Sequence, residues 1–400
     1  MTKPAAPVGS PVRNIALLSA SQAIVGSNQA ILMSVAALTG AGMIDDKSYA
    51  TLPVTMMIVG TALATGPAAW LIHSWGRREA FIFGVAIVIP AALLAGFAAW
   101  LGLFWLFCFA LAIIGATSAF ANQYRFAAAD SVPAAMKSTA ISWVLFGGVL
   151  SGFIGPQLSA LSKDLIPGHT FTATYVVMAL LGVVAIGVLS QTRLAPTVRD
   201  AAERKAGRPL PVLLRTPEIV VPMIASAVSY ALMVLVMVAA PLAMVFVCGH
   251  TTEAAAFAIQ WHIVAMYAPS FITGTVIKRI GAEVTAAIGL LLIIISAGIN
   301  LHGITTIHFD ISMVLLGIGW NFGFIASTSM LSEAYRPEEA ARVQGLNEQV
   351  VFGVMAIASI GSGLLLQTIG WQSINILAIP VATLGILALG FSMTRRKQAL

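Results

Sequence analysis

The chain has 400 residues, of which 59% are hydrophobic and only 9% are charged, and its formal net charge is +6. A soluble domain carries roughly a quarter of its residues as charged side chains, so this composition excludes a soluble globular protein. The two cysteines, Cys108 and Cys248, lie within or at the end of apolar stretches and give neither a metal-binding pair nor a disulfide framework. We therefore expect lipid around most of the chain, and no metal site.

Twelve apolar stretches follow one another along the chain, each long enough for a helix to cross a hydrocarbon layer of about 30 Å. Their predicted ranges are 13–39, 49–72, 79–98, 102–128, 138–161, 171–191, 217–247, 253–277, 284–301, 309–334, 343–366 and 372–393. Residues 286–299 are apolar on all sides, whereas strands of a membrane β-barrel alternate every second residue. The first stretch shows no cleavage site and is expected to remain as a helix. The sequence therefore predicts an all-α membrane protein with twelve transmembrane helices.

The longest polar stretch, 192–216, lies between the sixth and seventh predicted spans and carries eight charged residues. It predicts two six-helix halves, 1–191 and 217–400, joined by this linker. Short loops rich in Lys and Arg stay on the cytoplasmic side of a membrane. In this arrangement Lys47 and Lys163 are the only basic residues that face outside. We therefore expect both termini and the linker in the cytoplasm. The positive charge then reflects this sidedness, with contacts to anionic lipid, and does not indicate nucleic-acid binding.

Several motifs resemble those of one transporter family. The glycine turn at 76–78 resembles the signature loop between helices two and three of the major facilitator superfamily, and 278–281 resembles its degenerate copy in the second half. The glycines and proline of 148–156 resemble the glycine-rich helix-five motif of the same family, where small residues let helices approach closely. The family usually has Asp and a base where this chain has His73 and Ser74. Any gating ion pair carried by that Asp must be weaker, rearranged or absent here.

Three further tracts, 122–130, 260–262 and 319–322, resemble a bacterial permease group of this superfamily that includes riboflavin transporters. The resemblance implies a major facilitator fold and a secondary active transporter that moves a small organic solute across the bacterial inner membrane by alternating access. Riboflavin uptake, with protons as a candidate coupling ion, is the leading interpretation. A drug or metabolite efflux permease of the same superfamily is the alternative. We expect a monomer without a cofactor, since riboflavin would be cargo.

The substrate site of such a transporter is expected near the bilayer midplane, lined by helices of both halves. The polar and aromatic residues predicted to bind substrate are Gln22, Asn28, Asn122, Gln123, Tyr124, Arg125, Tyr230, Gln260, His262, Trp320 and Asn321. Acid, proline and base also recur after the fourth and tenth predicted spans. This recurrence predicts a cytoplasmic gating layer formed by Arg77, Arg78, Asp130, Lys137, Glu333 and Arg342.

Each candidate also has a structural interpretation. Amides such as Gln22 and Asn28 can exchange hydrogen bonds with a polar solute, but amides also tie transmembrane helices together. A guanidinium inside a span, as at Arg125, costs several kcal/mol, on the order of 3, unless a partner receives it. That partner is either the substrate or Asp130 near the cytoplasmic end, and the same two alternatives hold for the residues next to Arg125.

The second half offers a candidate proton carrier and a set of aromatic residues. His262 can exchange a proton near neutral pH or can be a neutral histidine that is hydrogen-bonded within the bundle. Tyr230, Trp320 and Asn321 suit a planar aromatic ligand, although aromatic residues also pack against lipid. The sequence shows no Walker-type loop and no paired metal-ligand histidines, so it does not favour an enzyme or a receptor. The two-half repeat disfavours a channel.

Overall fold

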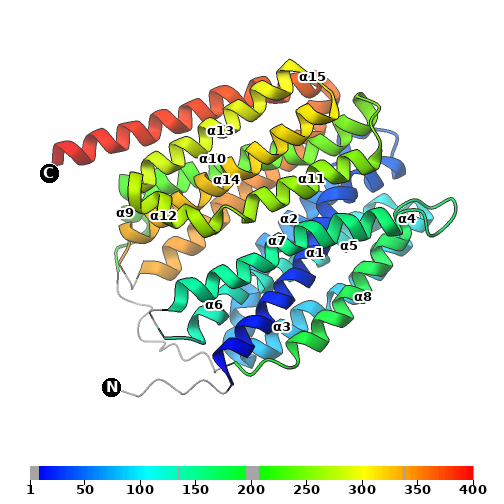
Figure 1. Ribbon diagram of the computed structural model, residues 1–400, viewed down its shortest axis with the longest axis horizontal. Coiled ribbons are helices and arrows are strands. Elements are labelled where there is room, and N and C mark those ends of the chain that lie inside the picture. Colours follow the sequence, from blue (N-terminus) through cyan, green and yellow to red (C-terminus); the bar gives the residue numbers. More distant parts are fainter. Residues whose placement is uncertain (1–8, 134–135, 195–206, 337–338, 400) are drawn as a thin grey trace. The chain divides into compact units, whose positions relative to one another are not determined.

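The computed structural model describes residues 9–133, 136–194, 207–336 and 339–399. Helices make up nearly all of this part of the chain, and no strand occurs within it (Figure 1). The chain divides into two compact units, Met1–Val198 and Arg199–Leu400. We call them unit 1 and unit 2 and describe each by itself.

Unit 1 begins with the long helix α1 and ends with α8. Its elements are α1 (Pro11–Met43), the 3-10 turn η1 (Lys47–Tyr49), α2 (Leu52–Trp75), α3 (Arg77–Ala86), α4 (Val88–Leu101), α5 (Phe104–Ala121), α6 (Tyr124–Asp130), α7 (Lys137–Ser162) and α8 (Thr172–Leu189). Only Ile87 separates α3 from α4, and only Asn122 and Gln123 separate α5 from α6. Each of these pairs therefore makes one broken crossing, and the described part of unit 1 contains the six predicted spans.

Unit 2 contains longer helices with sharper breaks. Its elements are α9 (Leu210–Leu213), α10 (Pro217–Leu242), the π-helical turn η4 (Ala243–Val247), α11 (Thr252–Tyr267), α12 (Ser270–Ile280), α13 (Ala282–His302), α14 (Thr306–Ala334) and α15 (Ala340–Ala399). Helices α11 and α12 together form one apolar crossing that is bent by 47°.

Helix α15 decides how many crossings the chain has. The described residues contain 10 helices that are long and apolar enough to cross a membrane, or 11 when α11 and α12 count as one span. Within the 60 residues of α15, Gly370 leaves helical geometry with φ 80° and ψ 173°. The sequence predicts a break between 366 and 372 at this place. Each arm of α15 exceeds the roughly 20 residues that a crossing needs, so the predicted twelve spans are reached when α15 is divided at Gly370.

Small residues allow the helices within each unit to pack closely. A Cβ at Gly155 of α7 would lie 2.7 Å from both Ala30 Cβ and Ser27 O of α1. A Cβ at Gly289 of α13 would lie 2.5 Å from the backbone nitrogen of Gly323 on α14. Real Cβ atoms do not approach other atoms this closely, so larger residues would push these helices apart. The glycines thus set the helix spacing in both units, as small residues do where lipid provides no hydrophobic drive.

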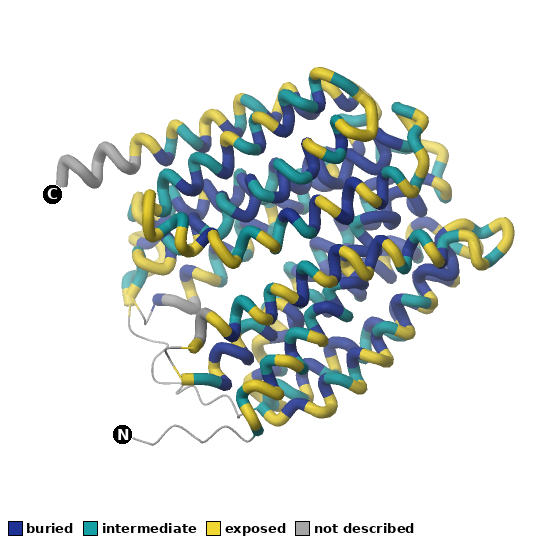
Figure 2. The backbone as a smooth tube through the Cα atoms, in the orientation of Figure 1, coloured by how far each residue is buried: buried dark blue, intermediate teal, exposed yellow. Residues whose placement is uncertain are grey.

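Large apolar side chains lie on the outside of both units. Leu180 on α8 is 60% exposed, Trp105 on α5 is 69% exposed and Leu384 on α15 is 67% exposed. In Figure 2 exposed and buried residues alternate along single helices, so that each helix has a buried and an exposed face. Patches of this kind are an aggregation hazard in water. In lipid they are the expected outer surface, because hydrocarbon tails are as apolar as the side chains.

Candidate functional site

Four aromatic side chains of unit 2 gather where α10, α11 and α14 meet. Trp320 and Phe324, one turn apart on α14, stack with ring centroids 5.3 Å apart and an interplanar angle of 10°. Tyr230 of α10 meets both rings edge-on, at 5.0 and 4.9 Å. Tyr267, the last residue of α11, lies 6.5 Å from Trp320. We call these four residues the aromatic cluster, and it unites the predicted Tyr230 and Trp320 with two residues that were not predicted.

Buried polar atoms without partners lie on the same helices as the aromatic cluster. Trp320 is 5% exposed, and its Nε1 has no hydrogen-bond partner among the described residues. The same holds for the hydroxyls of Ser226 and Ser229 on α10 and of Ser327 on α14. Ser226 lies one helical turn before Tyr230 and therefore on the same face of α10. An unsatisfied buried group costs about 1–3 kcal/mol, so these atoms call for a partner, which water or a ligand can supply.

The sequence pattern carries signals for these missed residues. Trp320 and Phe324 are four residues apart, the spacing at which two side chains on a helix touch. Ser226 and Tyr230 have the same spacing on α10. Serines are common in transmembrane helices as packing residues, and the sequence does not distinguish a serine whose hydroxyl is satisfied by its own helix from one that is left free.

His262 of α11 is fully buried and holds its helix against α14. Its Nδ1 lies 2.8 Å from the carbonyl oxygen of Met313. A carbonyl can only accept, so Nδ1 carries the proton, and in the neutral ring Nε2 is an acceptor. Nε2 has no partner among the described residues. Gln260 on the same helix is also buried.

Asn321 follows Trp320 on α14 but uses its amide within the protein. Its Oδ1 accepts from Thr273 Oγ1 at 2.6 Å. Its Nδ2 donates to the carbonyl oxygen of Met266 and to Ser270 Oγ, both at 2.7 Å. These residues flank the bend between α11 and α12, where helical hydrogen bonds are interrupted. In this conformation Asn321 therefore fastens α14 to the bend, and the partner-free polar atom next to it is the indole nitrogen of Trp320.

The α1 candidates of unit 1 lie at different depths. Gln22 is half-buried, whereas Asn28 is 3% exposed. Asn28 Nδ2 donates over a long 3.4 Å to the carbonyl oxygen of Met178 on α8, and its Oδ1 has no partner among the described residues. Asn28 also lines a cavity of about 10 Å³ together with Gln29 and Thr117. A cavity of that size holds about one water, which would supply the missing bond.

The predicted tract 122–125 coincides with the break between α5 and α6. Asn122 is exposed and Gln123 half-buried, while Tyr124 is fully buried against Phe81 of α3, with ring centroids 4.8 Å apart. Arg125 is half-buried, its guanidinium carbon lies 4.9 Å from the centre of the Phe126 ring, and its Nε has no partner among the described residues. The ring of Tyr124 thus packs in the core of unit 1, while the Tyr124 hydroxyl and Arg125 Nε are both buried without a hydrogen-bond partner among the described residues.

The charged residues at the end of unit 1 form pairs. Arg77 Nη2 lies 2.6 Å from Asp130 Oδ2, so Asp130 joins α6 to the start of α3. Arg78 Nη1 lies 3.3 Å from Glu79 Oε1, and the Arg78 guanidinium donates to the carbonyl oxygen of Ser190 at 2.6 and 3.2 Å. The side chain of Lys137 lies outside the described residues.

Unit 2 holds a stronger ion pair that was not predicted, between Arg208 and Glu339. The Glu339 side chain is 0% exposed and accepts from Arg208 Nε, Arg208 Nη2 and the Arg208 backbone nitrogen, each at 2.8 Å. It also accepts from the backbone nitrogen of Arg336 at 3.1 Å. These bonds, led by those from the Arg208 side chain, hold the pKa of Glu339 far below its usual range.

The two predicted members of the gating layer in unit 2, Glu333 and Arg342, do not form an ion pair with each other in the described structure. Glu333 is exposed, and Arg342 Nη1 donates to the carbonyl oxygen of Arg208 at 2.7 Å. The run Arg336 to Glu339 carried a signal, since an acid directly before a helix can accept from nearby backbone nitrogens. Its partner Arg208 lies 131 residues earlier in the chain, and a pair so far apart in the sequence cannot be recognised from local pattern.

Comparison with known proteins places the chain in a family. Residues 18–360 match the model of the Major Facilitator Superfamily. The chain belongs to the major facilitator superfamily. It is therefore a multi-pass membrane transporter, and the predicted family and fold class are confirmed.

Individual relatives agree with this assignment. The chain is 41% identical over 379 residues to the riboflavin transporter RfnT of Brucella anthropi, covering 94% of this chain and 95% of that protein. It is 27% identical over 348 residues to the MFS-type transporter YdeG of Bacillus subtilis, covering 83% and 81%. The crystal structure of a bacterial homologue of the iron transporter ferroportin, in the outward-facing state, aligns with TM-score 0.62 and 14% identity over 94% of this chain and 98% of that one. At that identity the structural match shows the fold alone.

The Arg208–Glu339 pair predicts a pH-dependent contribution to stability. Glu339→Gln should lower the melting temperature of the purified protein at neutral pH by several degrees, because the buried site is built for a charge. The folded pKa lies below the ordinary 4.5, so the pair stabilises the protein above that pH and loses its effect as pH falls towards the folded value. The difference between wild type and variant should therefore shrink in acid.

Glu333→Gln is the matched control, because it removes an exposed acid six residues away. Its melting temperature should equal that of the wild type. Equal melting temperatures for Glu339→Gln and the wild type at neutral pH would contradict the stabilising role of the pair.

Proposed function

We propose that the protein imports riboflavin across the bacterial inner membrane by alternating access. The observation that carries the proposal is the 41% identity to the riboflavin transporter RfnT over nearly the full length of both chains. The aromatic cluster of unit 2 supports it independently, since a flavin is a planar aromatic solute. The relatives from Brucella anthropi and Bacillus subtilis support a location of the protein in a bacterial membrane.

The chemistry of the aromatic cluster suits the flavin ring. One end of that tricyclic ring is apolar, and the other carries carbonyl oxygens, ring nitrogens and one N–H group. Stacked and edge-on aromatic rings such as Trp320, Phe324 and Tyr230 bind a flat ring by its faces and edges. Trp320 Nε1, which has no partner in the described part of the chain, can donate to a ring carbonyl, and the hydroxyl of Ser229 can donate or accept.

Unit 1 offers groups for a hydroxylated side chain. Riboflavin carries a chain of four hydroxyl groups, each of which can both donate and accept a hydrogen bond. Gln22, Asn28 and Arg125 remain our proposed contacts for such groups. Two of them have bonding capacity left, because Asn28 Oδ1 and Arg125 Nε have no partner among the described residues.

We further propose that the six-helix halves 1–191 and 217–400 are joined by the linker 192–216 in the cytoplasm, together with both termini. The one-sided distribution of Lys and Arg in the sequence supports this orientation. The Arg77–Asp130 and Arg208–Glu339 pairs would then lie on the cytoplasmic side of their units. Arg78, Lys137, Glu333 and Arg342 remain predicted members of this gating layer.

Proton coupling is proposed to run through His262. Its Nδ1 is held by the Met313 carbonyl oxygen, so a proton can be taken up or released only at Nε2. Nε2 is buried and has no partner among the described residues. A histidine fixed in this way can take up one proton at Nε2 and release it again in each transport cycle.

Riboflavin uptake tests the substrate and the site together. In a riboflavin-auxotrophic bacterium without its own importer, the wild-type protein should restore uptake of labelled riboflavin. Trp320→Ala should lower uptake at subsaturating riboflavin about tenfold, since aromatic stacking on a flat base is worth about 1–3 kcal/mol. Trp105→Ala, which removes a tryptophan that is 69% exposed, is the control and should leave uptake unchanged.

Two results would count against this account. A well-expressed wild-type protein that takes up no riboflavin would discard riboflavin import and turn the search to efflux. Full uptake by Trp320→Ala would leave the substrate in place but remove the aromatic cluster from the binding site.

A protonophore tests the role of His262 in the same cells. Wild-type accumulation of riboflavin should fall severalfold when the proton gradient is collapsed. His262→Gln should accumulate only to that reduced level, with no further effect of the protonophore, because glutamine keeps a donor near Met313 but cannot carry the proton. His302→Gln, at an exposed histidine on α13, should behave as wild type. Wild-type accumulation that is indifferent to the protonophore would exclude proton coupling.

A further inference from the structure

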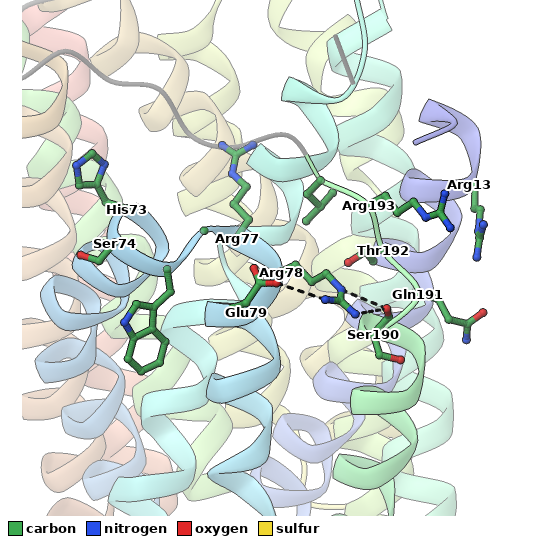
Figure 3. A pocket seen from close by; sticks show the side chains of 13 residues that line it. Arg13, His73, Ser74, Arg77, Arg78, Glu79, Ser190, Gln191, Thr192 and Arg193 are labelled. Atoms are coloured by element: carbon green, nitrogen blue, oxygen red, sulfur yellow. Dashed lines mark hydrogen bonds and ion pairs between the residues drawn. The ribbon is translucent and has the colours of Figure 1, made fainter. Parts of the chain in front are cut away.

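A wide cavity lies at one end of unit 1, apart from every residue proposed to bind riboflavin. Its volume is about 810 Å³. It is enclosed by the start of α1, the end of α2, the turn at Gly76, the first turn of α3 and the segment 190–194 after α8 (Figure 3). All of these elements belong to unit 1. We call this space the arginine cavity.

The walls of the arginine cavity are strongly cationic. Arg13, Arg77, Arg78 and Arg193 line it, and Glu79 is the carboxylate among its lining residues. Arg77 and Arg78 have carboxylate partners in Asp130 and Glu79. Within the described part of the chain, Arg13 and Arg193 have none. Two guanidinium groups thus line the cavity without a carboxylate partner among the residues that the structure describes.

The backbone around these two arginines is held in place. Asn14, which is 2% exposed, donates from Nδ2 to the carbonyl oxygen of Arg193 at 2.9 Å and accepts from the Arg193 backbone nitrogen at 3.1 Å. This reciprocal pair of bonds fastens the segment after α8 onto α1, directly beside Arg13. Arg78 fastens the same segment to α3 through the carbonyl oxygen of Ser190. The backbone that carries these arginines is therefore fixed before any ligand arrives, which reduces the cost of binding.

The first turn of α3 adds to the positive potential. Gly76 precedes it with φ 89°, a conformation suited to glycine, and no side chain caps the helix start by a hydrogen bond. Backbone N–H groups at a helix N-terminus favour an anion. Here this effect acts beside guanidinium groups, which bind phosphate oxygens through two parallel N–H bonds.

We propose that the arginine cavity binds a phosphate group. The ligand is either the headgroup of an anionic lipid or a soluble phosphate compound, since both present the same oxygens to the guanidinium groups. Trp75, which also lines the cavity and is 50% exposed, is typical of the membrane–water interface, where lipid phosphates lie. The site is independent of the riboflavin site and does not require transport.

Binding to the purified full-length protein in a neutral detergent tests the proposal. Thermal stabilisation is measured while phosphatidylglycerol is added, with phosphatidylcholine as the lipid control, and while inorganic phosphate is added against chloride at equal ionic strength. We expect phosphatidylglycerol or inorganic phosphate to raise the melting temperature saturably. Stabilisation by phosphatidylglycerol alone identifies a lipid site, and stabilisation by inorganic phosphate identifies a site for soluble phosphates.

Variants connect the binding to the cavity. The double variant Arg13→Gln with Arg193→Gln should weaken binding at least tenfold. His73→Asp should weaken it similarly by placing a second carboxylate on the wall, at an exposed position. Arg279→Gln removes an exposed arginine from the corresponding turn of unit 2 and should bind within twofold of wild type. Absence of stabilisation of the wild type by either ligand, or wild-type affinity in His73→Asp, would overturn the proposal.

Discussion

The structure depends on one constraint, which is that polar groups inside lipid must find partners within the protein. The constraint explains why the described chain is helical and why its breaks are supported by side chains. The bend between α11 and α12 is the clearest example. There Asn321 makes three hydrogen bonds, one to the backbone carbonyl oxygen of Met266 and two to the hydroxyl groups of Ser270 and Thr273, which hold α14 against both sides of the bend.

The same constraint sorts the polar residues within the spans into two groups. One group is fully occupied by the fold, as in Asn321. The other keeps buried atoms that have no hydrogen-bond partner in the described part of the chain, namely Trp320 Nε1, the Ser229 hydroxyl and His262 Nε2. A residue of the second group is costly to keep unless a ligand or a proton completes it. Unit 2 therefore contains polar residues that hold its helices together and, on the same helices, polar groups that are available to a ligand or a proton.

Much of this architecture could be predicted because it depends on local pattern. The apolar stretches gave the spans, and the break predicted between 366 and 372 lies where Gly370 leaves helical geometry. The Arg208–Glu339 pair could not be predicted, since it depends on how the last part of the 192–216 linker folds onto the segment between α14 and α15. Tyr124 shows a second limit. Polarity made it a candidate, but only the structure shows that it packs against Phe81 in the core of unit 1.

Counterflow of riboflavin in proteoliposomes tests the central claim most directly. Vesicles that contain the purified protein are loaded with unlabelled riboflavin and diluted into a trace of labelled riboflavin, without any ion gradient. An alternating-access riboflavin transporter should accumulate the label transiently above its outside concentration, and excess external riboflavin should abolish this overshoot. Vesicles with folded protein that show no more label than protein-free vesicles would contradict the claim that riboflavin is its substrate.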